Sequence, residues 1–307
     1  MRKRPLITTV SVLGLAAVGL TGCASGSGSS SGSSSDSGTI KVVASTNVYG
    51  GIVAAIGGSD VDVTSILSNP SQDPHSFEAS PRTQLAVSKA DLLIENGGGY
   101  DDYMDTLRKS TDSDAKLINV VKLSGLQKPG EDEFNEHVFY SYPTMVTFVD
   151  EVAADLGDEA PSKKSTFDGR AADLKQQLEG LESQTAAVKQ QYAGDRVAYT
   201  EPVPGYLFDA MGLVNATPEA FSEAIEEGDD VPPAALNDTI KLVSGGDRVK
   251  LLAYNEQTSS PETEQVQKAA EQNDVPVVGV TETLPSGKDY VQWQQDNIDA
   301  VKAALAK

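Results

Sequence analysis

Two series of short apolar runs, placed on either side of one long amphipathic stretch, constrain the fold of this chain most strongly. The first series contains β-branched runs at 40–44, 61–67, 91–95 and 116–121, with helix-like segments at 51–56, 83–88 and 100–107 between them. The second series has runs at 196–199, 249–254 and 277–280 and helix-like segments at 233–243, 261–272 and 290–306. Strands that alternate with helices predict parallel sheets flanked by helices.

The stretch between the two series predicts a single long helix over residues 165–192. Its apolar residues recur at steps of three and four, and charged or amide side chains fill most other positions. Such a helix is about 40 Å long at 1.5 Å per residue, and Gly194 is suited to end it. A dimeric coiled coil is the alternative interpretation of the same spacing.

We therefore predict an α/β protein of two lobes, each a parallel sheet flanked by helices, joined by one long helix. The predicted boundaries are 39–160 for the N-terminal lobe, 161–193 for the linking helix and 194–307 for the C-terminal lobe. The chain is long enough to bury a core in each lobe.

The first 38 residues are expected to lie outside this fold. Three basic residues at 2–4 and an apolar run at 6–20 predict a secretory signal peptide over 1–22, although a retained membrane anchor is the alternative. Residues 24–38 are almost all Gly and Ser, which predicts a flexible tether. The Leu-Thr-Gly-Cys segment at 20–23 resembles the lipobox of bacterial lipoproteins. That resemblance implies a lipid on Cys23, the only cysteine, and an extracytoplasmic protein anchored to the cell membrane.

Charge and histidine content narrow the class of function. The formal net charge is −21 and no basic patch is present, so a nucleic-acid partner is excluded. Most of the 45 acidic residues are expected to be solvated, so acidity alone does not predict a metal site. The chain has two histidines, His75 and His137, and each lies in a loop-like segment after a predicted strand. Imidazole is the commonest neutral metal ligand, so the pair is a candidate site.

Four segments, in order along the chain, carry a resemblance to a known family. They are Asp-Pro-His-Ser-Phe-Glu-Ala-Ser-Pro at 73–81, Glu-His-Val-Phe at 136–139, Val-Ala-Tyr-Thr-Glu at 197–201 and Val-Thr-Glu-Thr at 280–283. The chain from about residue 40 onward resembles the zinc- and manganese-type solute-binding proteins of ABC importers, also called cluster A-I. The resemblance implies four metal ligands, which fall on His75, His137, Glu201 and Glu282.

The sequence departs from the family pattern at two of these segments. Asn135 and Glu136 stand where the family usually has Asp-Pro, and Phe139 stands where it usually has Trp. Glu282 occupies a position that is usually Asp, which is one methylene shorter. Both departures retain a donor atom but are expected to alter the geometry of the site.

Two imidazoles and two carboxylates form a mixed nitrogen and oxygen site. Carboxylate-rich sites suit manganese, and in the family a Glu at the third ligand position is associated with manganese-type receptors. Zinc stays the alternative because its intrinsic affinity is higher. Since a ligating imidazole must be neutral, affinity is expected to fall below about pH 6.

The resemblance implies a monomeric receptor that delivers Mn²⁺ or Zn²⁺ to the membrane permease of an ABC importer and catalyses no reaction. Two alternatives stay open: a secreted metal-dependent hydrolase with Glu201 or Glu282 as general base, and an adhesin with a structural metal. Three glycines at 97–99 lack the Lys of a phosphate loop and predict a turn after a strand. Trp293 is expected to pack on the last helix, and the role of 254–257 is left open.

Overall fold

The computed structural model describes residues 38–69, 77, 79–128 and 134–307, and residues 38–307 form one compact unit. Cys23, the predicted signal peptide and His75 lie outside the described residues. We use "N-terminal lobe" for strands β1–β4 with helices α1–α5, and "C-terminal lobe" for strands β5–β8 with helices α7–α11. Among the described helices, none combines the length and the apolar character needed to cross a membrane.

The sheet of the N-terminal lobe has four parallel strands in the order β2-β1-β3-β4. Its central strands β1 and β3 are buried at all positions but one because helices cover both faces of the sheet, whereas the edge strand β2 is partly exposed along most of its length. The strands are β1 Ile40–Thr46, β2 Val61–Leu67, β3 Leu92–Glu95 and β4 Lys116–Asn119, and the helices are α1 Asn47–Gly57, α2 Pro81–Val87, α3 Tyr103–Thr111, α4 Val120–Ser124 and α5 Tyr142–Glu159.

The sheet of the C-terminal lobe repeats this arrangement, with four parallel strands in the order β6-β5-β7-β8. The edge strand β6 has two exposed residues, which explains why no apolar run predicted it. The strands are β5 Arg196–Tyr199, β6 Val214–Asn215, β7 Leu252–Asn255 and β8 Val277–Val280, and the helices are α7 Gly205–Ala210, α8 Glu219–Glu226, α9 Pro233–Ser244, α10 Pro261–Gln272 and α11 Tyr290–Leu305.

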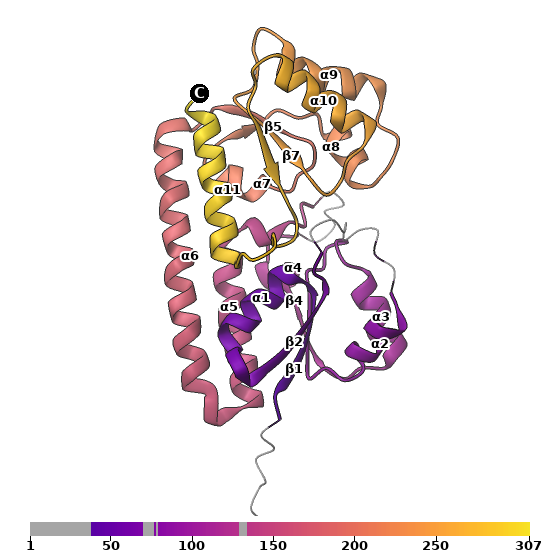
Figure 1. The fold of residues 1–307 in the computed structure, drawn as a ribbon, viewed down its shortest axis with the longest axis vertical. Coiled ribbons are helices and arrows are strands. Elements are labelled where there is room, and N and C mark those ends of the chain that lie inside the picture. Colours follow the sequence, from indigo (N-terminus) through magenta and orange to yellow (C-terminus); the bar gives the residue numbers. More distant parts are fainter. Residues whose placement is uncertain (1–37, 70–76, 78, 129–133) are drawn as a thin grey trace, which may run out of the picture. The chain divides into compact units, whose positions relative to one another are not determined.

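The long helix α6 spans Lys164–Tyr192 and runs beside α5 and α11 (Figure 1). Its apolar face, from Phe167 to Val188, is buried in the same core as residues of both lobes. The coiled-coil alternative would need this face for a partner chain, so the folded chain itself argues against it. Gly194 follows with a φ of 89°, as expected of a residue that ends a helix. The predicted fold class, two α/β lobes joined by one long helix, is confirmed.

Helix starts and stops follow local side-chain chemistry. Capping boxes begin α2 at Ser80, α10 at Ser260 and α11 at Asp289. The predicted strand at 116–121 is wrong at its end, because the Asn119 side chain accepts a hydrogen bond from the Lys122 backbone and starts α4 there. The predicted run at 249–254 likewise begins too early, since β7 starts at Leu252.

Aromatic side chains join the two lobes in one continuous core. Trp293 on α11 is buried and stacks on Phe139, and it also contacts Tyr140 edge-on. The Tyr140 hydroxyl donates to the Thr281 carbonyl at 2.8 Å, and the Tyr290 hydroxyl donates to the Phe139 carbonyl at 2.6 Å. The predicted packing role of Trp293 is therefore confirmed, and the packing surrounds the segment that follows His137.

Candidate metal centre

Three side chains at the carboxyl ends of the C-terminal strands lie together in the interior. Glu201 follows β5, Asn255 ends β7 and Glu282 follows β8, and their exposures are 3%, 1% and 2%. Parallel strands direct their carboxyl ends to one edge of a sheet, where ligands of open α/β sheets bind. Two buried carboxylates at that edge need polar or cationic partners.

Asn255 connects the two carboxylates. Its Nδ2 donates to Glu201 Oε2 and, at 2.7 Å, to Glu282 Oε1. Thr258 Oγ1 also donates to Glu201 Oε2, at 2.8 Å. Gln257 Oε1 accepts from the backbone N–H of Glu282 at 2.5 Å, which holds the strand-end loop in place. The segment at 254–257, whose role the sequence left open, thus supports both carboxylates.

His137 is oriented by Asn135, two residues earlier. Asn135 Oδ1 accepts from the backbone N–H of His137 at 3.0 Å and contacts His137 Nδ1 at 2.9 Å. Asn135 Nδ2 donates to the Pro202 carbonyl at 2.9 Å, so the amide can be placed in one orientation only. Nδ1 must therefore carry a proton and donate it to Asn135, which leaves Nε2 as the ligand atom.

The close approach of Asn135 to the C-terminal lobe depends on Gly205 at the start of α7. A Cβ atom at Gly205 would lie 2.5 Å from Asn135 Nδ2. Asn96 secures the same loop from the other side, since its Nδ2 donates to the Glu136 carbonyl at 2.9 Å. Asn96 itself precedes the three glycines at 97–99, all with positive φ, which confirms the turn predicted after β3.

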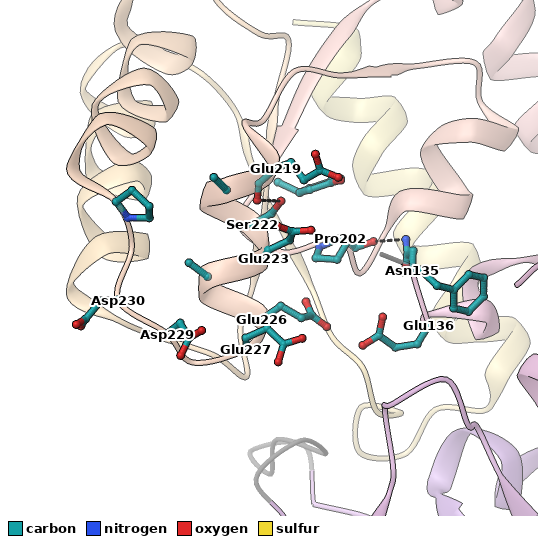
Figure 2. A pocket seen from close by; sticks show the side chains of 15 residues that line it. Asn135, Glu136, Pro202, Glu219, Ser222, Glu223, Glu226, Glu227, Asp229 and Asp230 are labelled. Carbon is teal, nitrogen blue, oxygen red and sulfur yellow. Dashed lines mark hydrogen bonds between the residues drawn. The ribbon is translucent and has the colours of Figure 1, made fainter. Parts of the chain in front are cut away.

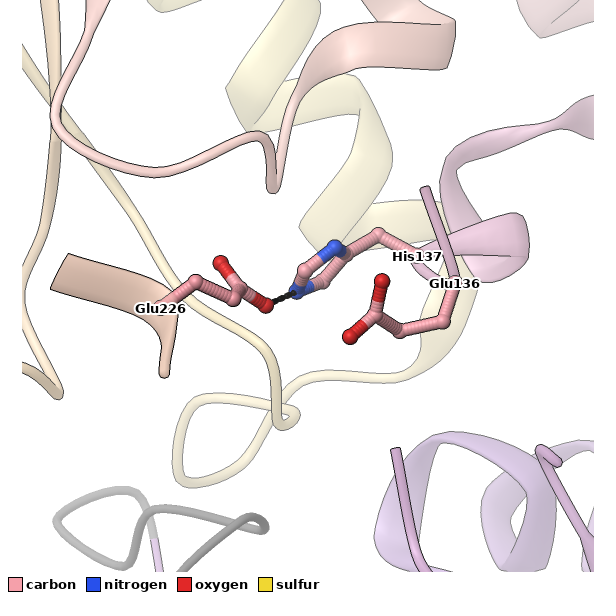
Figure 3. A group of neighbouring side chains, drawn as sticks. All are labelled: Glu136, His137 and Glu226. Carbon is pink, nitrogen blue, oxygen red and sulfur yellow. Dashed lines mark ion pairs between the residues drawn. The ribbon is translucent and has the colours of Figure 1, made fainter. Parts of the chain in front are cut away.

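His137 Nε2 faces carboxylates from two different elements. It lies 3.4 Å from Glu226 Oε1 (Figure 3). It also lies 3.6 Å from Glu282 Oε2. His137 is fully buried, and donor atoms of Glu136, His137 and Glu226 all lie within 4.8 Å of one another. The centre therefore gathers one imidazole and several carboxylates around a small volume.

A cavity of about 700 Å³ borders this centre, and acidic residues dominate its wall (Figure 2). Glu136 and Glu226 belong to both the cavity and the centre, and in Figure 2 their carboxylates point toward each other. The further acidic residues of the wall are Glu219, Glu223, Glu227, Asp229 and Asp230. A concave surface lined by one sign of charge raises the local concentration of cations.

Burial and crowding of like charges shift the proton affinities of the centre. Burial, with a smaller contribution from the neighbouring carboxylates Glu226 and Glu282, raises the pKa of Glu201 to about 8. Burial alone would lower the pKa of His137, but Glu226, Glu282 and Glu136 outweigh it and raise that pKa to about 10. Without a cation, protons therefore neutralise part of the negative charge.

Of the four residues implied by the resemblance, three lie in this one centre: His137, Glu201 and Glu282. His75 lies outside the described residues. Sequence reasoning missed Glu226, which lies on a helix that no apolar run predicted. One signal was present: α8 ends at Glu226, another acidic residue, Glu227, follows it, and the last turn has no basic residue.

Relatives of known function match most of the chain. The manganese ABC transporter substrate-binding lipoprotein PsaA of Streptococcus mitis is 22% identical over 320 residues, covering 97% of this chain and 98% of the relative. The manganese-binding lipoprotein MntA of Bacillus subtilis is 29% identical over 172 residues, covering 54% of each chain. The iron ABC transporter substrate-binding lipoprotein MtsA of Streptococcus pyogenes is 24% identical over 225 residues, covering 65% of this chain and 72% of the relative.

Solved structures share the fold. The periplasmic zinc-binding protein TroA of Treponema pallidum superimposes with a TM-score of 0.73 at 21% identity, covering 88% of this chain and all of the other. FpvC of Pseudomonas aeruginosa, solved with Mn²⁺, gives a TM-score of 0.70 at 20% identity over 87% of this chain and 98% of the other. The family model "Zinc-uptake complex component A periplasmic" matches residues 42–304. The chain therefore belongs to this family of metal-uptake receptors, as its sequence motifs predicted.

Proposed function

We propose that this protein is an extracytoplasmic receptor that binds a divalent transition metal ion between its lobes and delivers it to the permease of an ABC importer. The ligands in this proposal are His75, His137, Glu201 and Glu282. One observation carries it: His137 of the N-terminal lobe faces Glu282 of the C-terminal lobe, and one amide, that of Asn255, joins Glu282 to Glu201.

The chemistry of the donors favours manganese over zinc as the transported ion. Carboxylate oxygens suit Mn²⁺, whereas Zn²⁺ prefers nitrogen and sulfur ligands in a four-coordinate site. The described part of the centre presents one imidazole and carboxylates from three chain segments. PsaA and MntA are named as manganese proteins, which supports the same choice.

The receptor is proposed to act as a monomer held at the membrane surface by a lipid on Cys23. Substrate-binding proteins of ABC importers work with a membrane permease, and PsaA, MntA and MtsA are all named lipoproteins. A flexible tether at 24–38 would let the folded unit reach the permease while it stays anchored. PsaA and MtsA are named as substrate-binding lipoproteins of ABC transporters, which favours the receptor over the hydrolase.

Metal analysis of the purified full-length protein tests this function. We expect about one manganese or zinc ion per chain after exposure to either metal, and loss of that ion in the double variant His137→Ala, Glu201→Ala. The variant His75→Ala, measured in parallel, tests the ligand outside the described residues. Glu179→Ala, on the exposed face of α6, is the control and should keep its metal. Stoichiometric metal in the double variant would show that the site assignment is wrong.

A further inference from the structure

Glu226 lies in the metal centre but is not one of the four ligands that the family resemblance implies. We propose that Glu226 is an additional ligand of the transported cation and that it sets the preference for manganese over zinc. This inference rests on the proposed receptor function. It concerns a residue contributed by α8, which is separate from the strand ends that carry Glu201 and Glu282.

The geometry around His137 is the first argument. Asn135 occupies Nδ1 and leaves Nε2 for a cation, and Nε2 makes no hydrogen bond among the described residues. Glu226 Oε1 lies 3.4 Å from Nε2, which is longer than the roughly 2.8 Å of a charge-assisted hydrogen bond. Two donors bound to one ion at about 2.1 Å lie roughly 3.0–3.4 Å apart. Nε2 and Oε1 are therefore spaced as ligands that share an ion.

The position of Glu226 in its helix is the second argument. It is the last residue of α8, where the helix dipole is negative, and the last turn has no basic residue. A carboxylate at this end is disfavoured by its repulsion from the helix dipole. The side chain of Glu226 is only 10% exposed, so water relieves little of that repulsion. A cation bound beside the Glu226 carboxylate would offset its repulsion from the negative end of the helix dipole.

The number of carboxylates in the centre links Glu226 to metal choice. With Glu226 included, three carboxylates, those of Glu201, Glu226 and Glu282, accompany the imidazole of His137 among the described residues, and such oxygen donors suit Mn²⁺. Without Glu226, one of these oxygen donors is lost, whereas the nitrogen donor that Zn²⁺ prefers is kept. Glu226 should therefore contribute strongly to Mn²⁺ binding and weakly to Zn²⁺ binding.

The test compares Glu226→Gln with Glu179→Gln, which undergoes the same change in charge on the exposed face of α6. Mn²⁺ and Zn²⁺ affinities are measured by competition titration on the metal-stripped full-length protein. For Glu226→Gln we expect about a 30-fold or greater loss of Mn²⁺ affinity and less than about a fivefold loss for Zn²⁺. For Glu179→Gln both affinities should stay within about twofold of the wild-type values.

Glu226→Asp separates ligation from a general effect of charge. Asp keeps the charge but is one methylene shorter, so a ligand role predicts a loss of Mn²⁺ affinity close to that of Glu226→Gln. The inference would be overturned if Glu226→Asp kept the wild-type Mn²⁺ affinity. It would also be overturned if Glu226→Gln and Glu179→Gln had equal ratios of Mn²⁺ to Zn²⁺ affinity, and either result would leave the receptor function standing. A wild-type protein that binds neither metal would instead overturn the receptor function.

Discussion

The two lobes share one strand order but hold the groups of the metal centre in different ways. In the C-terminal lobe, Glu201 and Glu282 each lie two residues after the end of a strand, and both accept from the Asn255 amide. In the N-terminal lobe, His137 lies in a loop well after β4, and Asn135 and aromatic rings hold it. The two carboxylates are therefore positioned by the sheet of their own lobe, whereas His137 is positioned by contacts with the opposite lobe.

Contacts between the lobes are concentrated next to the proposed ligands. Asn47, at the start of α1, exchanges two hydrogen bonds with the backbone of Leu284, at 2.9 and 3.1 Å. The Tyr206 hydroxyl donates to the Asn135 carbonyl at 2.7 Å. Because these bonds flank Glu282 and His137, a change in lobe angle must alter the spacing of the donors. Although the two sheets have the same strand order, the two lobes contribute to the site in different ways. The C-terminal lobe holds a preorganised pair of carboxylates, whereas the imidazole of the N-terminal lobe is positioned by the interface between the lobes.

The largest effect that would test this comparison is the pH dependence of metal affinity. Near neutral pH, His137, with a pKa of about 10, and Glu201, with a pKa of about 8, both carry protons in the metal-free protein. A cation must displace both, one from each lobe. Between pH 6.5 and 7.5, isothermal titration should therefore show Mn²⁺ affinity rising about 100-fold, since each proton contributes about tenfold per pH unit.

Glu201→Gln is the control for this dependence, because it removes the titrating group of one lobe. The pH dependence of Mn²⁺ affinity in this variant should fall to about tenfold per pH unit, and a dependence of tenfold or less in the wild type would contradict two-proton release.

The raised pKa of Glu201 also affects stability, because a carboxyl whose pKa rises on folding favours the metal-free fold at acidic pH. That contribution is lost as the pH rises from about 4.5 toward about 8.

A smaller effect is expected from the two amides that position the ligands. Asn255→Ala removes a donor shared by two carboxylates and should weaken Mn²⁺ binding by about 10- to 100-fold, as for other supporting residues of metal sites. Asn135→Ala releases one imidazole and should cost about tenfold. Competition titrations measure both losses, and thermal melts of the metal-free variants report whether each still folds. If Asn135→Ala lost as much Mn²⁺ affinity as Asn255→Ala, or more, the positioning of His137 would contribute more to binding than the positioning of the two carboxylates.

The sequence predicted the elements in which apolar residues form a continuous run or recur at regular spacing. The strands β1, β5 and β8 and the helix α6 follow from apolar runs and from steps of three and four. The structure changes the expected pH window. An ordinary imidazole predicts loss of metal below about pH 6, whereas the carboxylates around His137 raise its pKa and move the expected change to higher pH. Such a shift depends on distances between residues far apart in the chain, which no local pattern contains.

Glu226 and Asn255 also show that local sequence patterns do not reveal contacts between residues far apart in the chain. Asn255 lay in a segment whose role the sequence left open, and its links to Glu201 and Glu282 span 54 and 27 positions. Glu226 belongs to a helix of eight residues, too short for periodicity to separate from a loop. Family resemblance selected Glu201 and Glu282 among 45 acidic residues, and it offered no position for Glu226.

The smallest expected effect concerns the buried hydrogen bond between α11 and the segment after His137. Tyr290→Phe keeps the ring but removes the hydroxyl that donates to the Phe139 carbonyl, so unfolding should become easier by about 1–2 kcal/mol. If the interface positions the imidazole, Mn²⁺ affinity should also fall, by about two- to threefold. Tyr142→Phe is the matched control, because its buried hydroxyl donates to Gln294 Oε1 at 3.2 Å instead of to this segment. Denaturant titration and Mn²⁺ titration of both variants should show similar losses of stability but a loss of affinity in Tyr290→Phe alone. Unchanged affinity in Tyr290→Phe would mean that Asn135, without help from α11, suffices to place His137.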